Sequence, residues 1–169
     1  RQIFTHPPVE TLRRFLDRFS FPVIVKEVGQ GMGPESLRSL LQLPLQAIEF
    51  GGFGGTNFAR VELLRDDRAK KEHFEPLSLI GEDPASMVGY VNRIIQEEKP
   101  MCRELIVSGG IKTFLDGYYL IRKSQLPAIY GMASTFLKYA RGDYEQLRNF
   151  VMNQVQGLEM AYAYLTIKE

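Results

Sequence analysis

This chain has a single cysteine, no excess of charge of one sign and no long apolar run, and each of these absences argues against a class of protein. A single cysteine, Cys102, rules out an internal disulfide and favours a reducing compartment. The 21 basic and 20 acidic residues give a net charge of +1 and are interspersed, so no basic footprint for nucleic acid is indicated. Apolar runs are far shorter than the roughly 20 residues of a membrane-spanning helix. We therefore expect a cytoplasmic protein whose partners include neither nucleic acid nor a membrane.

Apolar, β-branched runs alternate along the chain with segments of helical periodicity. Because parallel strands need a crossover connection, usually a helix, this alternation predicts an α/β fold with a parallel sheet. A charged stretch at 65–82 is expected to be an excursion from this scaffold. The expected strands are residues 23–28, 45–50, 104–108 and 127–130, the first of them buried. The expected helices are residues 9–19, 34–41, 85–98, 112–123 and 134–164, the last interrupted near 142–143.

The order strand, helix, strand occurs twice with similar lengths, at about 23–48 and again at about 105–129. Four strands alternating with helices are half of the eight that form a TIM (β/α)8 barrel of about 250 residues. The chain also begins at Arg1 rather than at methionine. We therefore expect residues 1–169 to be the C-terminal half of a TIM barrel, its last four βα units, with the N-terminal half absent.

Lys26 stands inside the first expected strand, shortly before Gly29. Strand alternation places it on one face together with Ile24 and Val28. A buried ammonium needs an acceptor, because leaving it unpaired costs several kcal/mol. Lys26 either faces the electron-rich N1/O2 edge of a flavin or pairs with a core carboxylate such as Glu49, and the strand alone leaves both interpretations open.

Glycine-rich segments follow each of the later strands. The motif GGFGGTN at 51–57 has four glycines in five positions, which suits close backbone approach or a positive φ. Its Thr56 offers a hydroxyl to a cofactor; the alternative is a flexible loop in which Thr56 or Asn57 caps the next helix. The motifs SGGIKT at 108–113 and GMA at 131–133 follow the next two strands, where the first free N–H groups of a helix bind phosphate.

These motifs together resemble those of the type 2, flavin-dependent isopentenyl-diphosphate isomerases. The resemblance rests on VKEVGQGM at 25–32, GGFGGTNFA at 51–59, SGGI at 108–111 and GMA at 131–133. It implies an enzyme of isoprenoid biosynthesis that interconverts isopentenyl and dimethylallyl diphosphate with FMN, NADPH and Mg²⁺. It also implies a homo-oligomer, a tetramer or octamer, that acts on a small-molecule diphosphate.

The resemblance also implies which residues bind the cofactor. Lys26 and Thr56 contact the flavin, while a second set holds the phosphate by backbone groups: Gly109, Gly110, Ile111, Met132 and Ala133. The family's catalytic and Mg²⁺-binding residues lie upstream of Arg1, so we expect no catalytic residue and no metal ligand here, and an inactive fragment. Phe114 departs from the family, because a small residue is common at its position.

Two alternatives remain. One is another FMN-barrel oxidoreductase, although such enzymes usually place a His or Cys base in the later strand loops. Here neither histidine follows a strand, and Cys102 precedes the third strand. The other is a non-catalytic phosphate-binding half-barrel, whose open sheet edges would need a partner chain to cover them.

Overall fold

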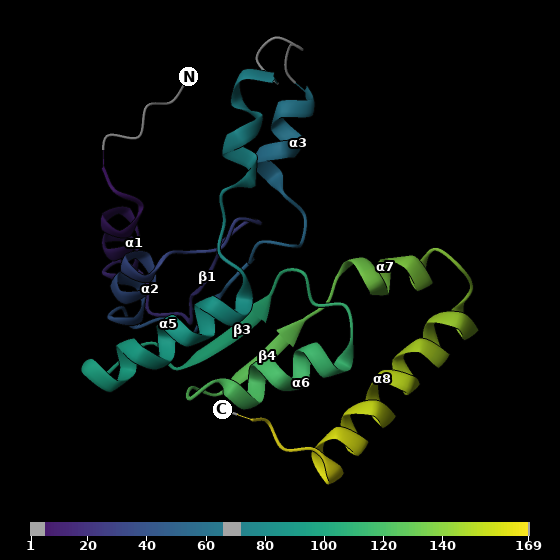
Figure 1. Ribbon diagram of the computed structural model, residues 1–169. Helices are drawn as coiled ribbons and strands as arrows, with labels where there is room; N and C mark the ends of the chain where they lie inside the picture. The colour runs from purple at the N-terminus through teal and green to yellow at the C-terminus, as the bar shows by residue number, and fades with distance from the viewer. Residues whose placement is uncertain (1–5, 66–71, 169) are drawn as a thin grey trace.

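The computed structural model describes residues 6–65 and 72–168, which form a small α/β domain (Figure 1). All four strands are parallel and pair in the order β1-β2-β3-β4. The strands are β1 (Ile24–Lys26), β2 (Ala47–Glu49), β3 (Glu104–Ser108) and β4 (Ala128–Gly131). The helices are α1 (Pro8–Leu16), α2 (Pro34–Leu41), α3 (Phe58–Arg65), the 3-10 helix η1 (Glu75–Leu79), α5 (Pro84–Glu97), α6 (Phe114–Lys123), α7 (Ser134–Ala140) and α8 (Tyr144–Tyr164).

The prediction of a TIM barrel is wrong for this structure, because the sheet is open. A barrel closes only when its first and last strands pair, and here β1 and β4 form the two edges of a four-stranded sheet. The alternation of strands and helices occurs in open and closed parallel sheets alike. Sequence periodicity therefore predicted the elements and their parallel pairing, but it carried no information on closure.

Helices of the described part of the chain cover one face of the sheet. Ile48, Leu105 and Val107 point to that face and are at most 1% exposed. They pack with leucines of α2, with Met87, Val88 and Val91 of α5, and with Leu120 of α6. Figure 1 shows α5 and α6 on the same side of β3 and β4.

On the opposite face the two edge strands are exposed, which corrects the prediction that the first strand is buried. Ile24 on β1 is 53% exposed, and Ile129 on β4 is 64% exposed. The β-branched run at 23–28 predicted the strand, observed at Ile24–Lys26, but in the described part of the chain helices cover only one face of it.

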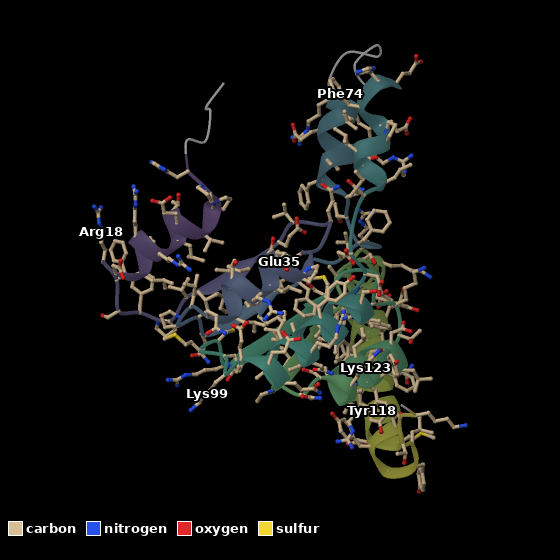
Figure 2. All side chains as sticks on the ribbon, turned by 60° about the vertical axis from the view of Figure 1, so that its left-hand side comes forward. Arg18, Glu35, Phe74, Lys99, Tyr118 and Lys123 are labelled. Atoms are coloured by element: carbon tan, nitrogen blue, oxygen red, sulfur yellow. The ribbon has the colours of Figure 1, made fainter. Side chains whose placement is uncertain are left out.

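The structure describes part of the segment 65–82, which was expected to leave the α/β scaffold. Residues 66–71 lie outside the described residues, while α3 and η1 contact each other on either side of them. Figure 2 shows this pair projecting from the body of the domain, with Phe74 near its outer end. The helix α3 was not predicted, because its apolar residues are spread around the helix rather than along one side.

The C-terminal helix α8 packs on α6, and α7 packs on α8. Gly157 of α8 lies against Phe114 at the start of α6, and a Cβ on Gly157 would be 2.6 Å from the Phe114 ring. Tyr118 of α6 donates its hydroxyl to the carbonyl oxygen of Leu165 at 2.6 Å. The large side chain of Phe114 is therefore accommodated by a glycine on the neighbouring helix. No helix in the described part of the chain is both long and apolar enough to cross a membrane.

Asp83 caps α5, as the Asp-Pro pair predicts. Its Oδ1 accepts the N–H groups of Ala85 and Ser86 at 2.9 and 3.1 Å, and its Oδ2 accepts the Ser86 hydroxyl at 2.6 Å. The hydrogen bond from the Ser86 side chain is the main reason why the pKa of Asp83 is lowered, and the two N–H groups add to it. Partial burial opposes this shift.

We expect Asp83→Ala to lower the free energy of unfolding by about 1 kcal/mol, the usual cost of losing an N-cap. Because the folded-state pKa is depressed, the contribution of Asp83 is present above its unfolded-state pKa and is lost as the pH falls through the folded-state value. Urea unfolding at neutral pH and again at a pH below both pKa values measures this, since the difference between wild type and variant should shrink in acid. A difference that stays constant with pH would contradict the assigned role.

Candidate functional site

A cavity of about 470 Å³ lies at the carboxyl ends of the strands, and all four strand ends contribute to it. This volume falls in the range of small-molecule and cofactor sites, roughly 300–1,000 Å³. In Figure 1 the arrowheads of β3 and β4 point to the side of the domain from which α3 and α7 leave. The lining residues come from four segments, namely 26–29, 49–58, 108–111 and 131–134.

The structure brings all seven predicted cofactor residues to this one cavity. Lys26 comes from the end of β1 and Thr56 from the loop after β2. The others lie in the loops after β3 and β4: Gly109, Gly110, Ile111, Met132 and Ala133. Their convergence follows from the parallel sheet, since the carboxyl ends of its strands meet at one edge. That these residues contact a cofactor stays a prediction.

The loops after β2 and β3 touch each other through their backbones. Gly109 has a φ of 105°, and a Cβ built on it would lie 2.1 Å from the carbonyl oxygen of Gly52. The N–H of Gly52 donates to the carbonyl oxygen of Ser108 at 2.8 Å. Gly110 also has a positive φ, of 69°. Glycine is therefore required at Gly109 for two independent reasons, conformation and space.

After β3, the donors that line the cavity belong to the loop rather than to helix α6, contrary to the prediction. Helix α6 begins at Phe114 and is closed by its own capping box, in which Thr113 and Asp116 each accept a backbone N–H of the other. No residue of α6 lines the cavity. Within residues 6–65 and 72–168, by contrast, the N–H groups of Gly109, Gly110 and Ile111 donate to no protein acceptor. These loop amides are available anion donors after β3, while after β4 the cavity is lined by Ala133, the N-cap of α7, and by Ser134, its first residue.

Lys26 and Glu49 form an ion pair across β1 and β2, where they are direct neighbours in the register. The Lys26 side chain is 53% exposed and that of Glu49 is 22% exposed, and both line the cavity. Pairing with Glu49 was one of the two interpretations of Lys26. The structure shows this pair, and it also places the ammonium in the cavity that the other interpretation requires.

The adjacent residues Thr56 and Asn57 have different surroundings. Asn57 accepts the N–H of Arg60 through its Oδ1 at 2.9 Å, and its amide donates to the carbonyl oxygen of Ser78. Asn57 therefore caps α3, as the alternative interpretation of this loop had it. Thr56 lines the cavity instead.

Glu27 was not assigned a role by the sequence analysis, although it lines the cavity. Its Oε2 accepts the N–H groups of Gly29, Gln30 and Gly31 at 2.6, 2.8 and 2.9 Å. A carboxylate placed two residues before a Gly-x-Gly segment is the signal that could have revealed it. Glu27 fixes the loop after β1, and so one wall of the cavity.

The described residues contain no group of three or more His, Cys, Asp or Glu side chains that could hold a metal ion. The charged side chains that line the cavity are Lys26, Glu27 and Glu49. Two of them pair with each other, and the third is occupied by backbone N–H groups.

Comparison with known proteins finds relatives that share one name. No family model matches the chain. Over 130 residues it is 40% identical to the isopentenyl-diphosphate delta-isomerase of Bacillus licheniformis, and over 152 residues it is 29% identical to that of Ignicoccus hospitalis. The aligned regions cover 75% and 88% of this chain but 34% and 41% of the two relatives. The chain thus spans little more than a third of the length of these relatives, and over about three quarters of its own length it is homologous to proteins named isopentenyl-diphosphate delta-isomerase.

Proposed function

We propose that this chain forms the flavin-phosphate site of a type 2, FMN-dependent isopentenyl-diphosphate delta-isomerase. The observation that carries the proposal is the single cavity at four parallel strand ends, lined by glycine loops and by one lysine. The names of the homologous proteins support the isomerase activity. The flavin-dependent type is supported by the cavity and by the motifs that line it.

The residues present fit FMN. A phosphate needs several converging N–H donors and room for close approach, and the loop Gly109, Gly110 and Ile111 offers both. Met132 and Ala133, in the segment after the neighbouring strand β4, line the same cavity. A flavin ring needs a polar partner at its N1/O2 edge, which the Lys26 ammonium supplies, and Thr56 adds a hydroxyl. Without side chains, the two glycine loops pack backbone against backbone, since a Cβ on Gly109 would meet Gly52 and one on Gly110 would meet Gly54.

In this proposal the chain binds and orients, and its residues carry out no proton transfer to the substrate. Backbone donors after β3 and β4 fix the phosphate, and Lys26 holds the ring by its charge. When bound, reduced FMN supplies the proton carrier that allylic isomerisation requires. We place the Mg²⁺ and diphosphate ligands, the NADPH contacts and any catalytic acid or base in the part of the longer relatives that this chain does not match.

The experiment uses the natural protein that contains these 169 residues. It is titrated with FMN under absorbance and fluorescence, and then assayed anaerobically with isopentenyl diphosphate, NADPH and Mg²⁺. We expect saturable FMN binding and formation of dimethylallyl diphosphate that depends on FMN. A protein that takes up no FMN overturns the flavin site. FMN binding without isomerisation, but with oxidation of a 2-hydroxy acid, favours an oxidoreductase instead.

Lys26→Ala tests the ring contact. Among the described residues that line the cavity, Lys26 is the only cation, so its removal should weaken binding of reduced, anionic FMN by about 10- to 100-fold, the range of one charge-assisted hydrogen bond. Equilibrium titration with reduced FMN measures the change. Lys99→Ala is the matched control, because Lys99 precedes β3 at the amino end of the sheet, away from the strand ends that form the cavity (Figure 2). Equal affinities of wild type and Lys26→Ala would refute the contact.

A further inference from the structure

Glu49 lies between two other strand ends in the cavity. On one side its Oε1 contacts the Nζ of Lys26, at the end of β1. On the other side the same oxygen accepts the hydroxyl of Ser108, at the end of β3, at 3.1 Å. Ser108 in turn accepts the N–H of Gly51 through its Oγ at 3.1 Å. Three neighbouring strand ends are therefore joined by one carboxylate.

This arrangement limits how Glu49 can move. Ser108 is only 8% exposed, and it is fixed by the Gly51 N–H as well as by its place at the end of β3. Its hydroxyl holds the Glu49 oxygen from the side opposite Lys26. The carboxylate consequently stays beside the ammonium, and it cannot turn away from the cavity without giving up both partners.

The charge that Lys26 presents to a ligand depends on this partner. With Glu49 in contact, the pair has no net charge, and the ammonium is directed to one place at the cavity wall. Without a charged partner, a full positive charge would face the cavity. The binding energy of a neutral ring would change little, whereas that of an anionic ring would change strongly. The reason is that charge–charge interaction energies exceed charge–dipole ones at the same distance.

We propose that Glu49 is a positioning residue that acts through Lys26 and sets how strongly the cavity prefers reduced, anionic FMN over oxidised FMN. This inference rests on the proposed function and deepens it. Glu49 holds the ammonium and balances its charge, and Lys26 makes the contact with the ring.

The test compares dissociation constants for oxidised and reduced FMN, together with the reduction potential of the bound flavin, in the natural protein. In Glu49→Gln, which keeps the side-chain shape and the acceptor for Ser108, reduced FMN should gain about tenfold in affinity over oxidised FMN. That ratio corresponds to a potential about 30 mV more positive for a two-electron couple. Glu49→Asp retains the charge and should stay close to the wild-type ratio.

A double-variant comparison separates positioning from simple structural support. In a Lys26→Gln background, adding Glu49→Gln should leave the ratio of the two affinities unchanged, because the carboxylate acts through the ammonium. If Glu49→Gln weakens both forms of FMN equally, or shifts the potential in the absence of Lys26 as well, the inference is overturned. Failure of the wild type to bind FMN would overturn the proposed function too, whereas FMN binding with an unshifted potential in Glu49→Gln overturns this inference alone.

Discussion

Gly109→Ala is expected to abolish measurable FMN binding, a loss of at least 100-fold. The residue has a φ of 105°, which L side chains rarely adopt, and forcing one into it costs about 1–3 kcal/mol. The new Cβ would also lie 2.1 Å from the carbonyl oxygen of Gly52 and 2.5 Å from its nitrogen. Since backbone cannot yield as a flexible side chain can, the loops after β2 and β3 must separate, and the N–H groups proposed to hold the phosphate then no longer converge.

The measurement is FMN titration, with circular dichroism and thermal unfolding to show that the variant folds. Gly89→Ala is the matched control: Gly89 lies inside α5, and a Cβ there meets nothing within 4 Å. Alanine in a helix interior should stabilise the domain by about 0.5–1 kcal/mol relative to glycine, with FMN affinity unchanged. If Gly109→Ala does not fold, Gly110→Ala replaces it as the milder change, its Cβ lying 3.2 Å from Gly54. Wild-type FMN affinity in a folded variant would refute the phosphate loop.

The order of the strands and of the helices other than α3 and η1 could be predicted from the sequence, because it depends on local signals. Pro34 opens α2, Asp83 caps α5 and Thr113 caps α6, and these three helices begin within a few residues of the predicted positions. Whether the sheet closes could not be predicted in the same way. Closure depends on whether the strands at the two edges find partners, and the pattern within Ile24–Lys26 or Ala128–Gly131 is compatible with either outcome.

The convergence of the site residues was also predictable, because it follows from a parallel sheet once the strands are known. What required coordinates were contacts between segments distant in sequence. Glu49 follows Lys26 by 23 residues, and Ser108 follows Glu49 by 59, so only the strand register makes them neighbours. The same holds for the contact between Gly109 and Gly52, which turns two weak glycine motifs into one tightly packed wall.

Among the variants considered, Glu27→Ala is expected to have the second largest effect, and its main effect is to lower the free energy of unfolding. Three N–H donors, those of Gly29, Gln30 and Gly31, lose their common acceptor. Hydrogen bonds to a charged group contribute about 1.5–3 kcal/mol each, but the freed donors regain water in part, so we expect the free energy of unfolding to fall by about 2–3 kcal/mol. Urea unfolding measures the loss. Glu159→Ala on the exposed surface of α8 is the control, and it should change little.

The loss should extend to the cavity, because the loop after β1 supports the loop after β2. Gly29 lies against the carbonyl of Thr56 so closely that a Cβ would come within 1.9 Å of its oxygen. When Glu27 no longer holds Gly29, Thr56 loses the surface that positions it, and FMN affinity should drop about tenfold even in molecules that remain folded. Glu27→Gln keeps an acceptor oxygen without the charge, so it should fall between wild type and Glu27→Ala in both measurements. A variant that is destabilised but binds FMN normally would show that the loop after β1 belongs to the fold alone and not to the site.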